Sequence, residues 1–107
     1  MKKYKVVITQ EALSDMKRIY DYIAKDLCAP GTAMGQYERI ANGILSLDCF
    51  PERFALFDSE PERSYGLRKM TVDHYLICYI IDSNTVTVTD VLYAPSNTHL
   101  ILSERHS

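Results

Sequence analysis

The start of the chain shows two hydrophobic patterns in succession. Residues 4–8 are rich in valine and isoleucine, which predicts a short strand that ends at Thr9, a good helix N-cap. Apolar residues then recur every three or four positions, which predicts a helix of about eighteen residues with one buried stripe. The stripe consists of Leu13, Met16, Tyr20, Ile23 and Leu27. Asp15, Arg18 and Lys25, which lie between these positions, are expected to face water.

Residues 28–32 (CAPGT) interrupt the helical pattern. Proline disfavours helical geometry at the residue before it, and glycine tolerates a turn. A second apolar stripe with helical spacing follows and consists of Ala33, Tyr37, Ile40, Ile44 and Leu47. Because the connection is short, the two helices are predicted to form an antiparallel hairpin. Residues 55–64, with Pro61 and several acidic side chains, predict an irregular loop.

Strand patterns dominate the rest of the chain. They cover residues 65–72, 75–81 and 85–93. Short turn sequences join them, so they predict an antiparallel meander. The middle run is apolar on both faces, which indicates a central strand covered on both sides. The apolar residues 99–102 are expected to form a closing helical turn.

The turns also predict which residues face one another across the strands. A two-residue loop at positions 73–74 gives these partners: Val72 with Tyr75, Met70 with Ile77, and Arg68 with Tyr79. A similar loop at positions 83–84 gives two more: Tyr79 with Val88, and Ile77 with Asp90. One extra residue would move side chains to the opposite face of the sheet, so this register depends on the loop lengths.

Size and charge limit the classes of protein that fit. The chain has 107 residues, 47% of them hydrophobic and 24% charged, which is typical of one domain covering residues 1–107. Twelve basic and fourteen acidic residues give a net charge of -2, so no overall field attracts the chain to nucleic acid. The sequence has no apolar stretch of membrane-spanning length and no signal-peptide pattern, which predicts a cytoplasmic location.

The sequence contains no strong motif for a cofactor or a metal. Phosphate-binding glycine loops, nucleophile elbows and zinc-ligand spacings are all absent from it, so no cofactor and no metal are expected. Cys28, Cys49 and Cys78 are widely spaced and form no C-x-x-C pair. They are therefore predicted to be reduced, buried thiols.

A group of polar and aromatic residues on the meander is the remaining candidate for chemistry. Its members are Arg68, Lys69, His74, Tyr75, Tyr79 and Tyr93, and His99 follows in the tail. Arg68 and Lys69 offer a planar donor fork and a point charge that could hold a phosphate.

A structural explanation of the same residues stands beside the chemical one. Tyrosines on strands commonly pack with their hydroxyl on water or on a carbonyl, and an arginine beside one can stack on its ring. His74 is equally typical of an exposed turn, and His106 of a disordered terminus. Arg53 and Arg63 are expected to form solvated surface pairs with nearby acidic residues.

Five segments together carry a family resemblance: residues 4–9 (YKVVIT), 19–23 (IYDYI), 50–54 (FPERF), 66–70 (GLRKM) and 74–82 (HYLICYIID). With these segments the chain resembles the RelE/ParE superfamily of toxins from type II toxin–antitoxin modules. The resemblance covers nearly the whole chain. It implies a RelE/ParE-like α+β fold, with an N-terminal strand, an antiparallel helix hairpin packed on a twisted antiparallel sheet, and a short C-terminal tail. It also implies a cognate antitoxin, which neutralises the toxin by wrapping an extended and partly helical segment over it.

The resemblance implies two kinds of activity, because one branch of the superfamily cuts mRNA on the ribosome and another poisons DNA gyrase. Cleavage requires a base, an acid and a fixed cation around the phosphate, and it would leave a 2′,3′-cyclic phosphate. Arg68 matches the strand arginine of the ribonuclease members. Tyr79 and His99 complete the candidate catalytic set, and Lys69, His74 and Tyr93 are the candidate substrate-binding residues.

The sequence also departs from the ribonuclease members. Two positions that are commonly basic there are occupied by Asp90 and by residues 93–97 (YAPSN). Ribosome-dependent mRNA cleavage is the first hypothesis. A toxin that binds gyrase, or a degenerate member that only binds its antitoxin, is the second. A small interaction domain unrelated to toxins is the third.

Overall fold

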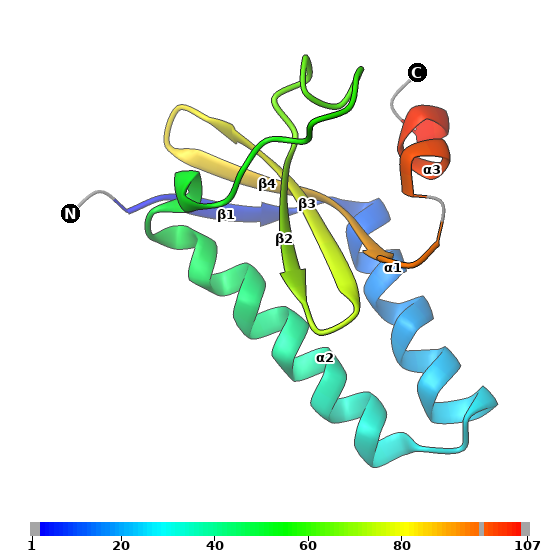
Figure 1. Ribbon diagram of the computed structural model, residues 1–107. Coiled ribbons are helices and arrows are strands. Elements are labelled where there is room, and N and C mark those ends of the chain that lie inside the picture. Colours follow the sequence, from blue (N-terminus) through cyan, green and yellow to red (C-terminus); the bar gives the residue numbers. More distant parts are fainter. Residues whose placement is uncertain (1–2, 97, 106–107) are drawn as a thin grey trace.

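The computed structural model describes residues 3–96 and 98–105, apart from the side chains of residues 99 and 103. The chain runs through seven main elements (Figure 1). They are β1 (Lys5–Ile8), α1 (Gln10–Asp21), α2 (Pro30–Leu45), β2 (Arg68–Val72), β3 (Tyr75–Asp82), β4 (Thr85–Tyr93) and α3 (Thr98–Arg105). A π-helical turn, Tyr22–Asp26, extends α1, and two 3-10 turns, Ser46–Asp48 and Pro51–Arg53, follow α2.

The four strands form one mixed sheet in the order β1-β4-β3-β2. The predicted antiparallel meander is confirmed, and β3 lies inside the sheet as expected. β1 is parallel to β4, which makes the sheet mixed and not purely antiparallel. The helices α1 and α2 form the predicted hairpin and diverge below the sheet, while α3 stands apart from them beyond the end of β4 (Figure 1). The α+β architecture is therefore the expected one.

The predicted register of the first hairpin is confirmed at every position. The observed partners include Val72 with Tyr75, Met70 with Ile77, and Arg68 with Tyr79. The second hairpin begins as predicted, with Tyr79 opposite Val88. The prediction for Asp90 is wrong, because a β-bulge beside Thr89 shifts the register and places Asp90 opposite Cys78, not Ile77. The extra residue lies in the strand and not in the loop, and it turns Asp90 toward the other face of the sheet.

α1 begins as predicted but buries a different set of residues. The Thr9 side chain accepts a hydrogen bond from the Ala12 N–H at 3.1 Å, which confirms the N-cap. The buried face consists of Ala12, Asp15, Met16 and, in the π-helical turn, Ile23. Leu13 and Leu27, which were assigned to the stripe, are exposed. Asp15 was expected to face water and is buried, because it contacts α3 and β4 as described below.

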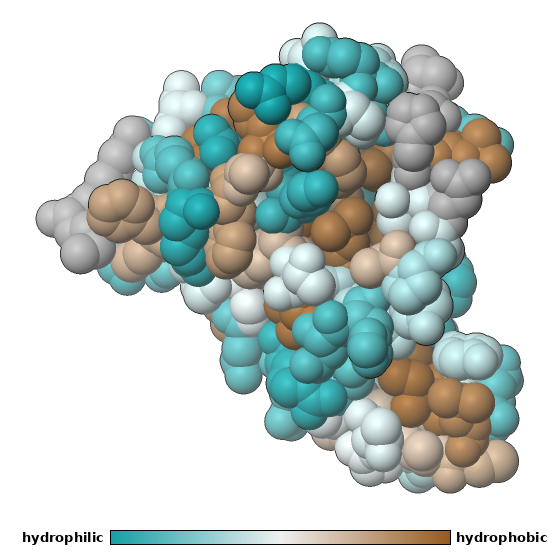
Figure 2. Space-filling model, viewed as in Figure 1, coloured by the Kyte–Doolittle hydropathy of each residue, from teal (hydrophilic) through white to brown (hydrophobic). Residues whose placement is uncertain are grey.

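The connection between the helices differs in detail from the expected break. Cys28, not Gly31, takes the left-handed conformation, with φ of 52°. Pro30 is the first residue of α2, a position where its missing N–H costs nothing. Leu27 and Met34 of this region are exposed. Figure 2 shows a brown patch at the tip of the hairpin.

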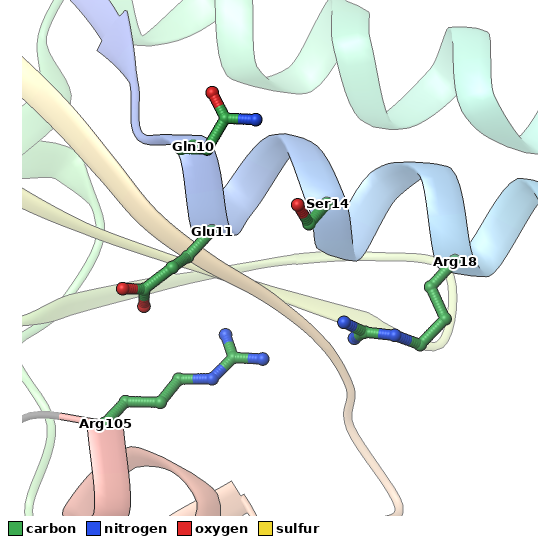
Figure 3. A pocket seen from close by; sticks show the side chains of 5 residues that line it. All are labelled: Gln10, Glu11, Ser14, Arg18 and Arg105. Atoms are coloured by element: carbon green, nitrogen blue, oxygen red, sulfur yellow. The ribbon is translucent and has the colours of Figure 1, made fainter.

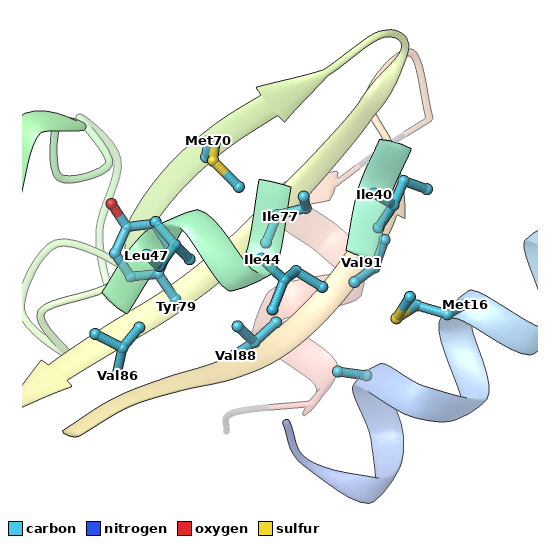
Figure 4. Packing of buried hydrophobic residues seen from close by; sticks show 11 residues of the cluster. Met16, Ile40, Ile44, Leu47, Met70, Ile77, Tyr79, Val86, Val88 and Val91 are labelled. Atoms are coloured by element: carbon cyan, nitrogen blue, oxygen red, sulfur yellow. The ribbon is translucent and has the colours of Figure 1, made fainter. Parts of the chain in front are cut away.

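Two hydrophobic clusters lie on opposite faces of the sheet. The larger cluster packs α1 and α2 against β2, β3 and β4 (Figure 4). The smaller cluster lies under α3 and the 55–67 segment and consists of Phe57, Leu67, Leu76, Cys78, Leu92 and Leu102. β3 is therefore covered on both sides, which explains its continuous apolar sequence.

Three smaller expectations have mixed outcomes. Cys78 is buried as predicted, whereas Cys28 is exposed and Cys49 is intermediate. The closing helical turn is longer than expected, because α3 has eight residues. His106 lies outside the described residues.

Among the helices that the structure describes, none has the length and apolar character needed to cross a bilayer.

Two glycines of α2 predict opposite effects of the same substitution. A Cβ on Gly43 would lie 2.9 Å from Val72 Cγ2, because α2 approaches β2 closely there. We expect Gly43→Ala to destabilise the protein by about 1–2 kcal/mol despite the gain in helix propensity. On Gly35 a Cβ would meet only the end of the flexible Arg39 side chain, so Gly35→Ala should stabilise by up to about 1 kcal/mol. Urea unfolding of the two variants tests this, and equal shifts would contradict the close approach at Gly43.

Candidate functional site

Arg68 and Tyr79 lie side by side on β2 and β3, next to the Pro51–Arg53 turn. The Arg68 Nη1 donates to the Phe54 carbonyl oxygen at 2.7 Å and to that of Glu52 at 3.4 Å. The Tyr79 hydroxyl donates to the Pro51 carbonyl oxygen at 2.6 Å. Both side chains therefore hold the backbone of this turn, which is the structural use that tyrosine and arginine commonly have on strands.

A second arginine, Arg53, belongs to this turn and connects it to the residues before it. The Arg53 guanidinium donates to the carbonyl oxygens of Cys49 and Phe50 at 2.6 and 3.0 Å and to the Ser46 hydroxyl at 3.0 Å. It also lies 4.6 Å from the centre of the Phe54 ring. The expectation that Arg53 forms only solvated pairs with acidic neighbours is wrong, because backbone carbonyls at the end of the second helical segment bind it.

The expectation of solvated surface pairs is also wrong for Arg63. One acidic residue of the 55–64 loop departs from it as well. The Arg63 Nη1 donates to the Phe57 carbonyl oxygen at 3.3 Å. Glu62 is buried, and its carboxylate accepts a hydrogen bond from the Ser59 hydroxyl at 3.1 Å. The loop is therefore irregular, as predicted, but hydrogen bonds between its own polar groups stabilise it.

The burial of Tyr79 determines what its hydroxyl can do. Its side chain is 0% exposed. Burial raises the pKa of the Tyr79 phenol to about 12, although the nearby Arg68 and Arg53 lower it. The hydroxyl therefore stays protonated near neutral pH and donates to the Pro51 carbonyl oxygen.

The other candidate residues lie elsewhere. Lys69 points to the opposite face from Arg68, and its Nζ lies 5.2 Å from the centre of the Phe57 ring. His74 is exposed in the β2–β3 turn, where its carbonyl oxygen accepts from the Ala94 N–H at 2.8 Å. Tyr93 is exposed near this turn. The candidate His99 lies on α3, but its side chain is outside the described part of the chain.

The structure thus divides the candidate set among three places. Arg68 and Tyr79 are together at one end of the β2–β3 pair, as the register predicted. His74 and Tyr93 are together at the other end, where the Tyr93 ring lies 5.7 Å from that of Tyr75. Lys69 is on the face that carries the smaller hydrophobic cluster. No described arrangement brings these residues around one phosphate-sized position.

A buried charge cluster that the sequence did not predict joins α1, β4 and α3. The Arg105 guanidinium donates to both Asp15 oxygens, at 2.7 and 2.8 Å, and to Asp90 Oδ1 at 2.8 Å. Asp15 also accepts from the Val91 N–H at 3.0 Å and from Arg18 at 3.0 Å, and Asp90 accepts from the Thr89 hydroxyl at 2.8 Å. We call Asp15, Asp90 and Arg105 the charge clamp.

The electrostatics of the charge clamp follow from its burial and its hydrogen bonds. Asp15 and Asp90 are 1% and 0% exposed, and the Arg105 side chain is 22% exposed. Burial pushes the pKa of Asp15 up, but hydrogen bonds from Arg105 and the Val91 N–H outweigh it, so the pKa is lowered. The same contacts raise the pKa of Arg105. Both carboxylates thus have a hydrogen-bonded cation, which a buried charge requires.

One feature of the sequence indicated the charge clamp. Asp90 stands where the resembling ribonucleases carry a basic residue, and an acid on an apolar strand needs a partner. The partner could not be identified, because Arg105 is far along the chain and the bulge that turns Asp90 toward it was not predictable from alternation.

Two shallow pockets lie beside α1, one toward α3 and one toward α2. The first, about 320 Å³, lies between α1 and α3 and is lined by Gln10, Glu11, Ser14, Arg18 and Arg105. In Figure 3 the side chains of Arg18 and Arg105 extend toward it from the two helices. The second, about 460 Å³, lies between α1 and α2 and is lined by Leu13, Lys17, Tyr20, Asp21, Met34 and Tyr37. Among the described residues, no group of three metal-binding side chains is present.

The fold is similar to that of several solved structures, two of which are described as toxin–antitoxin systems. The chromosomal ParDE system from P. aeruginosa matches with a TM-score of 0.71 and 19% identity, over 85% of this chain and 96% of that chain. The RelBE2 toxin–antitoxin complex from Mycobacterium tuberculosis matches with a TM-score of 0.61 and 20% identity, over 87% and 93% of the two chains. The YoeB dimer from Staphylococcus aureus matches with a TM-score of 0.57 and 13% identity, over 85% and 97%. At these identities the likeness shows the fold.

Sequence comparison gives the family. Residues 6–95 match the family of the ParE toxin of the type II toxin–antitoxin system parDE. The chain belongs to this family, within the RelE/ParE superfamily of type II toxins. The family is described as the toxin of a toxin–antitoxin system. A search of curated proteins found no significant match.

Removal of the Tyr79 hydroxyl tests its structural role. We expect Tyr79→Phe to lower the free energy of unfolding by about 1–2 kcal/mol, because the buried Pro51 carbonyl oxygen loses its donor. Tyr75→Phe, on the same strand and only partly buried, is the matched control and should change stability by less than about 0.5 kcal/mol. Urea denaturation of both variants gives the comparison. Equal stabilities of Tyr79→Phe and wild type would show that the hydroxyl does not hold the turn.

The lowered pKa of Asp15 predicts acid sensitivity. A carboxylate whose pKa is lower in the folded state stabilises the protein above its unfolded pKa of about 4, and this contribution is lost as the pH falls through the folded value. We expect Asp15→Asn to cost about 3 kcal/mol at pH 7, and the difference from wild type to shrink below about pH 3. Urea unfolding at both pH values measures it. A difference that does not change with pH would contradict the role of the ionised carboxylate.

Proposed function

We propose that this toxin arrests growth by binding a protein target, and that DNA gyrase is this target, as in the gyrase-poisoning branch of the superfamily. The observation that carries the proposal is the use of Arg68 and Tyr79. Both donate to backbone carbonyl oxygens of the 51–54 segment, and Tyr79 is fully buried. The structural contacts of the two residues that best matched a catalytic pair support a function that does not depend on them for chemistry.

The charge on the sheet supports the same proposal. RNA cleavage needs a cation that stabilises the extra negative charge on the phosphate. On β4 the position that is commonly basic in the ribonuclease members carries Asp90, and Arg105 neutralises it from α3. Asp90 is fully buried and its carboxylate binds the Arg105 guanidinium, so this position supplies no cation for a phosphate. A binding function requires no such cation.

Ribosome-dependent mRNA cleavage is the second candidate. It is favoured by the position of Arg68, which matches the strand arginine of the ribonuclease members and is only partly buried. His99 would then supply the acid. In both cases the protein would act in the cytoplasm, together with its antitoxin.

Induced expression with two readouts distinguishes the candidates. We expect the chain to stop growth and to inhibit DNA supercoiling by purified gyrase, and cellular mRNA to show no new 5′ ends. Arg68→Lys, which keeps the charge but not the planar fork, is the variant for the nuclease. New mRNA ends that disappear in Arg68→Lys, together with unaffected gyrase, would overturn the proposal and support mRNA cleavage. Circular dichroism of the variant confirms that the fold is kept.

A further inference from the structure

The turn that follows α2 carries an exposed aromatic side chain on a strained backbone. Phe50 has φ of 51° and ψ of 52°, in the left-handed region that bulky residues rarely adopt. Glycine and asparagine adopt this conformation at lower cost. Phe50 is also 63% exposed and belongs to neither hydrophobic cluster of the described residues. Neither core packing nor backbone preference therefore explains a phenylalanine at this position.

Hydrogen bonds hold the backbone on both sides of Phe50. Every carbonyl oxygen from residue 48 to residue 52 accepts one. The donors are the Tyr4 N–H and the side chains of Arg53, Arg68 and Tyr79. In Figure 1 this turn lies beside the start of β1, to which the Tyr4 N–H connects it. A turn held from several sides can keep Phe50 in a conformation that an isolated chain would avoid.

A fixed and exposed aromatic ring is suited to enter a pocket of another protein. Aromatic side chains at the centre of an interface contribute much of the binding free energy. A ring that is held in place before binding loses little conformational freedom when it binds. Single exposed apolar residues are common on protein surfaces and need no such explanation. Among the exposed large apolar residues that the structure describes, however, Phe50 alone has a positive φ.

The charges of the turn favour a protein pocket over a nucleic acid. Lys3 Nζ lies 3.2 Å from Asp48 Oδ2. The guanidinium groups of Arg53 and Arg68 donate to backbone carbonyl oxygens. An aromatic ring that stacks on a base acts together with cations that bind the phosphate backbone, whereas these three cations already bind oxygens of this chain. The surface that complements Phe50 is therefore apolar and not anionic.

We propose that Phe50 is the anchor through which this toxin binds its protein target, with the ring inserted into an apolar pocket of that target. The inference rests on the proposed function, in which the target is DNA gyrase. It adds the residue that makes the contact and the kind of surface that receives it. Arg53, Arg68 and Tyr79 are positioning residues in this contact, because they fix the backbone that carries the ring.

Replacement of Phe50 by asparagine separates binding from folding. Asparagine adopts the left-handed conformation more readily than phenylalanine does, so we expect Phe50→Asn to unfold at the same urea concentration as wild type or at a higher one. Its affinity for purified gyrase, measured by surface plasmon resonance, should fall by about ten-fold or more. Leu27→Asn is the matched control, because Leu27 is 55% exposed and precedes the other end of α2. This control should bind gyrase as tightly as wild type.

Three results would overturn the anchor. The first is a loss of affinity in Phe50→Asn that is smaller than about ten-fold. The second is an equal loss in Leu27→Asn. The third is unfolding of Phe50→Asn at a lower urea concentration than wild type, which would show that the ring serves the fold.

Growth arrest tests the anchor even where gyrase is not the target. If the wild-type chain does not bind gyrase, the proposed function fails, and the variants are compared in induced cultures at equal protein levels. Phe50→Asn should then lose the arrest that Leu27→Asn keeps. Arrest that persists in Phe50→Asn would overturn the anchor, and so would wild-type mRNA cleavage that disappears in this variant, since the ring would then bind RNA. A wild-type chain that causes no arrest would overturn both proposals.

Discussion

The Arg105 guanidinium between Asp15 and Asp90 is the interaction on which the arrangement of the elements depends. It connects the first helix, the last strand and the last helix through hydrogen bonds of 2.7–2.8 Å. Both carboxylates are buried, and a buried charge needs a hydrogen-bonded partner of opposite charge, which Arg105 supplies. The bulge beside Thr89 is the geometric condition for this contact, since it turns Asp90 away from the helix pair and toward α3. α3 is thereby held over the smaller hydrophobic cluster.

Two other arginines also bind oxygen acceptors that need a donor, on the opposite side of the sheet. Arg53 and Arg68 bind carbonyl oxygens at the end of the second helical segment and in the turn after it, and Tyr79 adds a third donor. Carbonyls at helix ends need partners, and side chains supply them here. Arg68, the candidate cation of a ribonuclease, thus binds backbone carbonyl oxygens in this fold. These contacts support the proposal of a toxin that works by binding.

The two faces of the sheet are covered by different elements. The larger cluster under α1 and α2 is continuous and supplies most of the core. The smaller cluster is closed by α3 and the 55–67 segment. β3 is therefore packed on both sides, which a strand with a continuous apolar sequence requires.

The sequence by itself determined the local elements, the helix cap at Thr9, the first hairpin register and the membership of the chain in a toxin superfamily. The elements, the cap and the register follow from periodicity and turn length, which act over a few residues. The superfamily followed from the resemblance of several segments to a known family. It also identified Arg68 and Tyr79 as neighbours, but not the carbonyls that they bind. Only the tertiary structure decided that Asp15 is buried, that Asp90 faces α3 and that Arg105 joins them. The physical reason is that a one-residue bulge and a contact across 90 positions leave no periodic trace in the sequence.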